Sequence, residues 1–234
     1  MKKFIFDVDG TLTPSRQKID AEFGKFFFDF CCKNHVYLVT GSDKDKTIEQ
    51  VGTVIYNLAR KAYNCSGSDV YERGKNVYTS DWTLPSKAHL YLRNEIAESD
   101  FPLRTGLHIE ERPGMVNFSV VGRNATMAER KLYVKHDIKN NERNIIAKKF
   151  MEEFPQIQAV VGGETGIDIF PKGNDKSQIV RDFDPNDELH FFGDRMDPAG
   201  NDYPLKKIIL DNDLGICYNV KDYKHTWELL KQYD

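Results

Sequence analysis

Short apolar runs alternate with longer amphipathic stretches at both ends of the chain. The first apolar run predicts a buried strand over residues 3–7, and apolar side chains at helical spacing predict a helix over residues 19–33. A second apolar run predicts a strand over residues 35–39, and a helix over residues 44–60 follows it. This order of strand, helix, strand and helix is typical of a parallel sheet with both faces covered.

The pattern changes after about residue 80. The elements predicted there are a helix over 84–98, strands around 107–110 and 115–121, a charged helix over about 138–153, and strands near 157–162 and 166–170. From about residue 174 the first pattern resumes, with a helix over 175–183, a strand over 189–192 and a closing helix near 222–232. We therefore expect an α/β fold, in which a parallel-sheet core (residues 1–80 and 174–234) carries an inserted α+β cap domain (residues 81–173).

Composition and charge are those of an ordinary globular protein of 234 residues. A formal net charge of −3 provides no overall basic field, so we expect no nucleic-acid partner. The four cysteines show no metal-ligand spacing, which is consistent with reduced thiols in the cytoplasm. We expect no signal peptide before Asp7 and no contact with a membrane, because no apolar run approaches the length of a membrane span.

The most informative segment is Asp7-Val8-Asp9-Gly10-Thr11-Leu12-Thr13, directly after the first predicted strand. In an extended chain alternate side chains point the same way, so Asp7 and Asp9 are expected to face one small volume. Two such carboxylates repel unless a cation or a proton lies between them, and Mg²⁺ prefers oxygen ligands. A lone pair of acids is more often a solvated loop, but the complete string after an apolar strand predicts phosphoryl transfer to an aspartate.

The string resembles the first motif of the haloacid dehalogenase (HAD) superfamily, which has a Rossmann-like core. That resemblance implies that Asp7 is the nucleophile and that Asp9 is the general acid and base. Ser42 or Thr40, in the loop after the second predicted strand, would bind a phosphate oxygen.

Two further residues of the C-terminal segment complete the expected site. Lys176 would neutralise charge on the transferring phosphoryl group. Asp194, which follows the strand at 189–192, would bind Mg²⁺ together with Asp7 and the backbone carbonyl of Asp9. Each residue alone is modest evidence, but their order and spacing around the first motif together argue against a chance match.

Longer motifs resemble those of the eukaryotic-type phosphomannomutases, which have a type IIB cap. The matching segments are residues 7–19, 109–119, 121–123, 128–130, 162–176, 191–194 and 198–202. The resemblance implies that cap residues Arg112, Arg123 and Arg130 bind a second phosphate far from Asp7, because the guanidinium fork grips phosphate oxygens in two places. Other residues that the resemblance places at the substrate are Arg16, Gly166 and Asp168, with Asp168 accepting hydrogen bonds from sugar hydroxyls.

The implied reaction interconverts mannose 6-phosphate and mannose 1-phosphate through an aspartyl-phosphate enzyme and a hexose bisphosphate. Its implied cofactors are Mg²⁺ and a hexose 1,6-bisphosphate as activator, and its product would feed GDP-mannose synthesis. Cap closure would keep water from the aspartyl phosphate. The resemblance also implies a cytoplasmic homodimer formed through the cap, with small-molecule sugar phosphates as the substrates.

The chain departs from the family pattern at two cap positions. Gly166 stands where the family usually has a serine, and Glu111 is expected to place an extra carboxylate beside the arginine clamp. Three hypotheses follow: a phosphomannomutase, a HAD-family sugar-phosphate phosphatase, and a sugar-phosphate-binding protein without activity. The intact acids and Lys176 argue against the third hypothesis, and the three cap arginines favour the first over the second.

Overall fold

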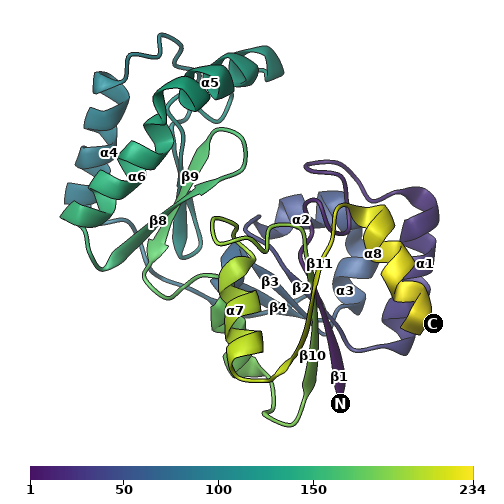
Figure 1. The fold of residues 1–234 in the computed structure, drawn as a ribbon. Helices are drawn as coiled ribbons and strands as arrows, with labels where there is room; N and C mark the ends of the chain where they lie inside the picture. The colour runs from purple at the N-terminus through teal and green to yellow at the C-terminus, as the bar shows by residue number, and fades with distance from the viewer. Residues whose placement is uncertain (234) are drawn as a thin grey trace. The chain divides into compact units, whose positions relative to one another are not determined.

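A computed structural model describes residues 1–233, and these form two compact units (Figure 1). The first unit contains Met1–Ser80 and the chain from Asn174 onward, and the second is the inserted segment Asp81–Gly173. The first unit has an apolar core on each face of its sheet, and the second has a single core. The α/β fold class expected from the sequence is confirmed.

A seven-stranded sheet forms the centre of the first unit, in the order β11-β10-β1-β2-β3-β4-β5. Its parallel strands are β1 (Lys2–Phe6), β2 (Val36–Val39), β3 (Lys61–Asn64), β10 (Glu188–Gly193) and β11 (Gly215–Asn219). Two antiparallel strands, β4 (Asp69–Glu72) and β5 (Lys75–Thr79), extend one edge. Since β1 lies between β2 and β10, the loops after these three strands emerge at the same edge of the sheet.

Helices cover both faces of this sheet (Figure 1). On one face lie α1 (Ala21–Lys33), α2 (Lys44–Val51), α3 (Thr53–Leu58) and α8 (Tyr223–Leu230). On the other lie α7 (Tyr203–Asp211) and the short 3₁₀ helix η2 (Lys176–Asp182). The alternation of β1 explains the two layers, because Phe4 and Phe6 belong to the first core and Ile5 to the second.

The inserted unit is a four-stranded antiparallel sheet, in the order β6-β7-β9-β8, packed against three helices. Its strands are β6 (Ile109–Arg112), β7 (Met115–Phe118), β8 (Ile157–Gly162) and β9 (Gly166–Pro171). Its helices are α4 (Ser86–Glu98), α5 (Met127–Asn140) and α6 (Glu142–Glu153). Val116 and Phe118 of β7 point into the core with Ile167 and Ile169 of β9, and the residues between them therefore lie on the opposite, polar face.

Three predicted helices differ from the structure. The helix expected over 44–60 is two helices, α2 and α3, which meet at Gly52. The helix expected over 138–153 is also wrong as a single element, since Asn141 adopts a left-handed conformation (φ 55°) that ends α5 and allows α6 to begin. The helix expected over 175–183 is the 3₁₀ helix η2, and the β4–β5 hairpin had not been anticipated.

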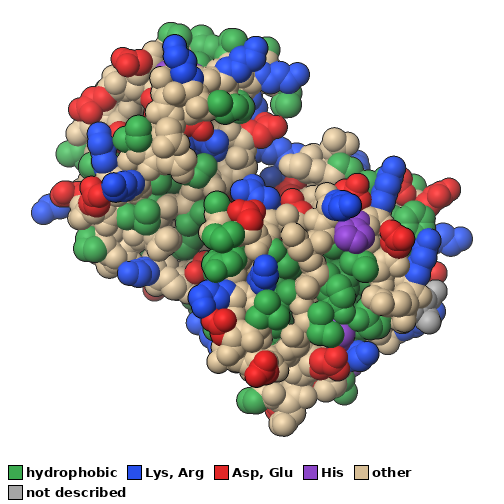
Figure 2. All heavy atoms as spheres, in the orientation of Figure 1, with side chains coloured by type: hydrophobic (Ala, Val, Ile, Leu, Met, Phe, Trp, Pro, Cys, Tyr) green, Lys and Arg blue, Asp and Glu red, His purple; other side chains and the backbone are tan. Residues whose placement is uncertain are grey.

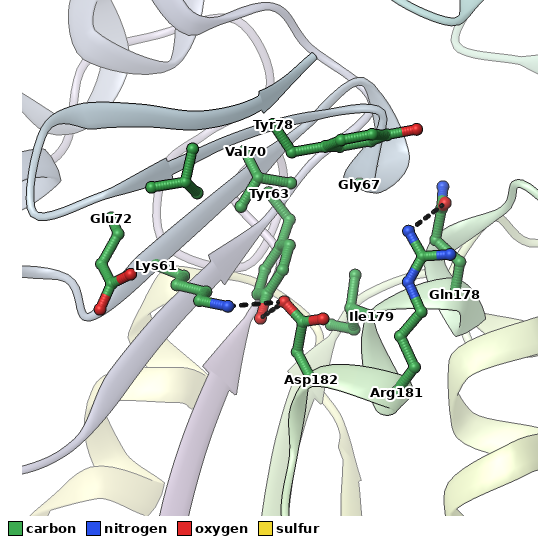
Figure 3. Close-up of a pocket in the computed structure, with 11 residues that line it drawn as sticks. Lys61, Tyr63, Gly67, Val70, Glu72, Tyr78, Gln178, Ile179, Arg181 and Asp182 are labelled. Carbon is green, nitrogen blue, oxygen red and sulfur yellow. Dashed lines mark hydrogen bonds and ion pairs between the residues drawn. The ribbon is translucent and has the colours of Figure 1, made fainter. Parts of the chain in front are cut away.

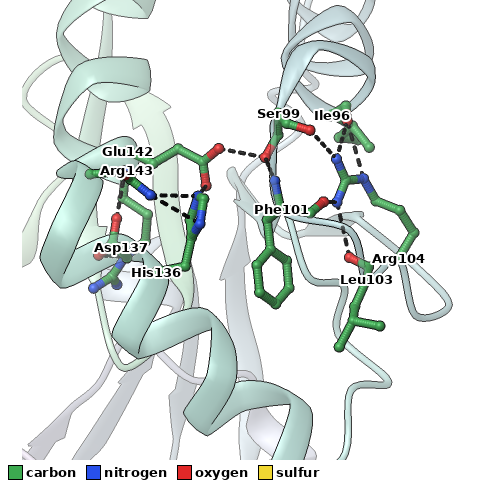
Figure 4. A network of polar contacts seen from close by, with 10 residues as sticks. Ile96, Ser99, Phe101, Leu103, Arg104, His136, Asp137, Glu142 and Arg143 are labelled. Carbon is green, nitrogen blue, oxygen red and sulfur yellow. Dashed lines mark hydrogen bonds and ion pairs between the residues drawn. The ribbon is translucent and has the colours of Figure 1, made fainter.

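The C-terminal end of α4 is held by a guanidinium group rather than by a residue of its own last turn (Figure 4). Arg104 donates to the carbonyl oxygens of Ile96 (2.8 Å from Nη2), Ser99 (2.9 Å), Leu103 (3.0 Å) and Phe101. The carbonyls at a helix end have no partner within the helix, and the planar fork supplies donors to several at once. Arg104 thus fixes both the helix end and the turn that follows.

We expect Arg104→Met to destabilise the inserted unit by about 2 kcal/mol, because carbonyls near a helix end lose charged donors. Thermal unfolding and amide hydrogen exchange of α4 measure the effect. Arg93→Met is the matched control, since Arg93 is exposed on the same helix. Equal stability of the two variants would contradict the capping role.

Charges of both signs are mixed on the face of the molecule shown in Figure 2. Lysine and arginine side chains alternate there with aspartate and glutamate over both units, in keeping with the small net charge of the chain. None of the helices within residues 1–233 is long and apolar enough to cross a membrane.

Candidate active site

The centre of the candidate site is the ammonium group of Lys176, which lies between two carboxylates. Its Nζ donates to Asp7 Oδ1 at 2.5 Å and to Asp202 Oδ1 at 2.7 Å, and all three side chains are buried. Asp7 directly follows β1, and Lys176 is the first residue of η2. Asp202 directly precedes α7, and its second oxygen accepts from the backbone N–H of Arg195 at 3.0 Å.

A third carboxylate, that of Asp194, joins this cluster. Asp194 directly follows β10, and Asp7, Asp194 and Asp202 can each direct one oxygen to within 4.8 Å of the others. Gly10 makes the approach possible, because it adopts a positive φ (79°) and a Cβ on it would lie 2.3 Å from Asp194 Oδ2. The parallel neighbours β1 and β10 thus deliver Asp7 and Asp194 to the same edge of the sheet.

Burial and neighbouring charges shift the pKa values of the groups in this cluster. Burial raises the pKa of Asp7 well above its usual range, with Lys176 opposing the shift and the other two acids adding to it. Burial, together with Asp202, also raises the pKa of Asp194 to about 6. Burial alone would lower the pKa of Lys176, but the carboxylates of Asp202 and Asp7 outweigh it and raise that pKa above its ordinary value.

The cluster fits a divalent cation. Three carboxylates and one ammonium leave two negative charges without compensation when all are ionised, and a Mg²⁺ ion would balance them. Both oxygens of Asp202 accept hydrogen bonds of 3.0 Å or less, whereas the hydrogen bond that Asp7 Oδ2 accepts from Thr11 Oγ1 is longer, at 3.3 Å, so Asp7 and Asp194 are the better direct ligands. One or two carboxylates are the usual protein contribution to a Mg²⁺ site shared with phosphate.

Asp9 is held apart from the three-acid cluster by partners of its own. Its Oδ1 accepts from the backbone N–H of Arg16 at 2.7 Å and from Gln50 Nε2 at 2.9 Å. Gln50 is buried and also donates to Thr13 Oγ1 at 3.2 Å. The contact that Arg16 makes to this site is therefore through its backbone, while its side chain is exposed.

Ser42 and Thr40 lie in the loop that follows β2, at the edge of the sheet where Asp7 lies. Both are buried, and Thr40 Oγ1 accepts from the backbone N–H of Ser42 at 3.1 Å. Backbone hydrogen bonds from Cys65 and Ser66 to the carbonyls of Ser42 and Thr40 tie this loop to the loop after β3. A hydroxyl that accepts a hydrogen bond can still donate one, so Ser42 and Thr40 both stay candidates to bind a phosphate oxygen.

The helix that carries Lys176 is fixed at both ends. Near its start, Gln178 Nε2 donates to the carbonyl oxygens of Ser66 (2.9 Å) and Asn174 (3.1 Å). At its end, Asp182 Oδ2 accepts from Lys61 Nζ (2.8 Å) and Tyr63 OH (3.1 Å) of β3, beside a pocket of about 320 Å³ (Figure 3). These contacts hold the backbone from which the Lys176 ammonium reaches the acids.

The inserted unit contains the arginines that the sequence assigned to a phosphate clamp. Arg112 Nη2 and Arg123 Nε converge on one oxygen, Glu110 Oε2, at 2.6 and 2.9 Å. Arg130 is buried and lies 3.5 Å from the exposed carboxylate of Glu164. The expectation that Glu111 lies beside the clamp is corrected, because alternate residues of β6 point to opposite faces and the carboxylate at Arg112 is that of Glu110.

Asp168 and Gly166 lie on the polar face of the same sheet. Asp168 is paired with Asn117 of β7 in the strand register, and Asn117 Nδ2 donates to Asp168 Oδ1 at 2.5 Å. The structure therefore groups Asp7, Lys176 and Asp194 in the first unit, and Arg112 with Arg123 in the second.

Two residues of the first unit's site were not predicted as such. Asp202 belongs to a segment that resembled a metal-binding motif, but the sequence did not show that its side chain would bind Lys176. Gln50 had no local signal at all, because its contact to Asp9 spans 41 positions of the chain. Only the packing of α2 against the loop after β1 brings it there.

Comparison with known proteins decides the family. The model of the eukaryotic phosphomannomutase family matches residues 23–233. This chain belongs to the eukaryotic phosphomannomutases. It is similar to the phosphomannomutase of Drosophila melanogaster, with 34% identity covering 97% of this chain and 93% of that protein. The phosphomannomutase of Saccharomyces cerevisiae is 32% identical over 86% of this chain and 83% of its own length.

Solved structures show the same fold at much lower identity. A haloacid dehalogenase subclass IIB sugar phosphatase matches with a TM-score of 0.59 and 15% identity, covering 100% of this chain and 99% of that one. The C-terminal domain of the trehalose-6-phosphate phosphatase of C. albicans matches with a TM-score of 0.63 and 16% identity, covering 95% and 80%. This chain therefore has the HAD fold, as expected from its first motif.

We expect Mg²⁺ to raise the melting temperature, and the gain to be larger at pH 8 than at pH 5. Protonation of Asp194 stabilises the metal-free fold at low pH, and this contribution is lost as the pH rises through about 6, where the ion can replace the proton. At a Mg²⁺ concentration of about 100 Kd the stabilisation is about 2.7 kcal/mol. Calorimetry with and without EDTA measures it.

The matched control for this experiment changes an acid outside the cluster. Asp194→Asn is expected to lose most of the Mg²⁺ effect, whereas Asp197→Asn, at an exposed position nearby, is expected to keep it. A gain that is the same at both pH values, or the same in both variants, would argue against the proposed ligands.

Proposed function

We propose that this protein interconverts mannose 6-phosphate and mannose 1-phosphate through a hexose bisphosphate, with Asp7 as the phosphoryl carrier. Its membership of the eukaryotic phosphomannomutases supports an isomerase, and the buried group of Asp7, Lys176, Asp194 and Asp202 supports phosphoryl transfer. Mannose 1-phosphate made in this way would feed GDP-mannose synthesis.

The single observation that favours a mutase is the convergence of two guanidinium groups on Glu110 Oε2. A carboxylate oxygen in that position marks where an anionic oxygen is bound, and a phosphate oxygen has the same requirement for charged, forked donors. A mutase needs such a second site because its intermediate carries two phosphates. We propose that Arg112, Arg123 and Arg130 bind the phosphate that is not reacting.

In the proposed chemical step an oxygen of Asp7 forms a bond to phosphorus while the bond from phosphorus to the sugar oxygen breaks. Asp9 donates its proton to that leaving oxygen and recovers one when the next hydroxyl attacks. Lys176 opposes the effect of burial on the pKa of Asp7 and orients its carboxylate, since it donates to the other oxygen at 2.5 Å. Bound Mg²⁺ would offset negative charge on the phosphoryl oxygens, held by Asp7, Asp194 and the backbone carbonyl of Asp9.

The remaining roles complete the proposal. Ser42 would bind a phosphate oxygen, Asp168 a sugar hydroxyl, and Arg16 the substrate from the first unit. Gly166 would border the sugar through its backbone. A hexose 1,6-bisphosphate would act as activator by phosphorylating Asp7, and family membership supports a cytosolic homodimer formed through the inserted unit.

A coupled assay with mannose 1-phosphate, Mg²⁺ and glucose 1,6-bisphosphate tests the activity. We expect mannose 6-phosphate to form without stoichiometric release of inorganic phosphate, and Asp7→Asn to abolish turnover, because an amide oxygen cannot form the aspartyl phosphate. Release of phosphate without isomerisation would instead establish a sugar-phosphate phosphatase.

Arg123→Gln tests the second phosphate site. We expect the KM for mannose 1-phosphate to rise by about tenfold or more, because a charged hydrogen bond to phosphate is lost. The fraction of turnovers that releases free hexose bisphosphate is also expected to rise, since the intermediate escapes more readily. Arg93→Gln, exposed in the same unit, is the control, and an unchanged KM for Arg123→Gln would refute the clamp.

A further inference from the structure

One buried amide on the polar face of the inserted sheet has a partner for its NH₂ group but none among residues 1–233 for its oxygen. Asn117 of β7 is 6% exposed and pairs in register with Glu110 of β6 on one side and with Asp168 of β9 on the other. Directly paired residues of antiparallel strands project to the same face. Asn117 therefore stands between the carboxylate that binds two clamp arginines and the carboxylate proposed to bind the sugar.

The orientation of the Asn117 amide follows from its partner. An ionised carboxylate only accepts hydrogen bonds, so the NH₂ group must be the end that faces Asp168 Oδ1, at 2.5 Å. The opposite end, Oδ1, is a buried acceptor for which the described residues, 1–233, supply no hydrogen-bond donor. A buried acceptor without a donor costs free energy, which a ligand hydroxyl at this position would recover.

Two glycines leave room for this arrangement. Gly166 and Gly162 pair across β9 and β8, so neither strand presents a side chain there. A Cβ on Gly166 would lie 2.8 Å from Asn117 Nδ2 and 3.1 Å from Oδ1, and a Cβ on Gly162 would lie 2.5 Å from Asp168 Oδ2. The missing side chain at Gly166 therefore does not enlarge the sheet surface, because the Asn117 amide takes the space in which a Cβ would begin.

We propose that Asn117 is a substrate-binding residue whose Oδ1 accepts a hydrogen bond from a ring hydroxyl of the hexose phosphate. Asp168 would bind a neighbouring hydroxyl through Oδ2, and the bare backbone of the glycine pair would lie beside the ring. This inference rests on the proposed function, in which the inserted unit binds a sugar phosphate. Asn117 then contributes to selectivity among hexose phosphates, because a site built to bind a hydroxyl rejects a sugar that lacks it.

Deoxy sugars test the contact directly. kcat/KM is measured for mannose 1-phosphate and its 2-, 3- and 4-deoxy analogues, in the native enzyme and in Asn117→Ala. In the native enzyme we expect kcat/KM for one of the three analogues to be about tenfold lower than for mannose 1-phosphate. In Asn117→Ala, kcat/KM for mannose 1-phosphate is expected to fall by a similar factor. Removing the same hydroxyl from the substrate is then expected to lower kcat/KM of this variant little further, since the protein partner of that hydroxyl is already absent.

A purely structural role for Asn117 predicts a different result, namely an equal loss for every sugar. Val160→Ala is the matched control, because Val160 is paired with Asp168 on the other side and its side chain has no hydrogen-bonding group. It is expected to keep the native pattern of losses among the analogues. Gly166→Ala, which displaces the amide without removing it, is expected to weaken the same analogue-specific discrimination.

The outcomes separate this inference from the proposed function. If every deoxy analogue loses the same factor in the native enzyme and in Asn117→Ala, the hydroxyl contact is refuted even where the coupled assay shows a mutase. If the native enzyme forms no mannose 6-phosphate and Arg123→Gln has no effect, the proposed function itself is wrong. Binding of the analogues to the Asp7→Asn variant, measured by calorimetry, then still reports whether Asn117 contacts a hydroxyl.

Discussion

The ion pairs of Lys176 are the interaction on which the first unit's site depends. Its buried ammonium binds Asp7 from the loop after β1 and Asp202 from the start of α7, and so joins parts of the chain that lie 169 and 26 positions from it. A buried pair of this kind is weak evidence for stability, because desolvation offsets much of the attraction. Its consequence is electrostatic: the Lys176 ammonium lowers the pKa of Asp7, against the burial and the neighbouring acids that raise it.

In the inserted unit the arrangement of charges is reversed, and one carboxylate pairs with two guanidinium groups. Arg112 and Arg123 are brought together by β6 and the segment after β7, and Glu110 compensates them while fixing the direction of their donors. On the proposed function, this carboxylate would preorganise the two arginines for phosphate and also compete with it. Such competition would suit a mutase, whose bisphosphate must leave the proposed clamp and return in the reverse orientation, better than an enzyme that needs only tight binding.

Sequence and structure agree where the signal is local. The strands before Asp7 and before Asp194 were predicted from short apolar runs, and parallel pairing then brings the acids to one sheet edge. Gln50 could not be assigned to Asp9, because only tertiary packing joins them. The helix expected over 138–153 ran across Asn141 and missed most of α5, because a left-handed backbone at one residue gives no clear signal in the pattern of apolar positions.

Glycine next to a carboxylate serves the same purpose in both units. At Gly10 the missing Cβ lets Asp194 approach the backbone of the loop after β1, and at Gly166 it lets the Asn117 amide reach Asp168. Both contacts place polar groups closer together than side chains on those residues would allow. The departure at Gly166 from the usual serine is then not a simple loss of a hydroxyl. The space in which a side chain of β9 would begin is taken by the Asn117 amide of β7, which donates to Asp168 from the neighbouring strand and keeps the acceptor that we propose for the sugar.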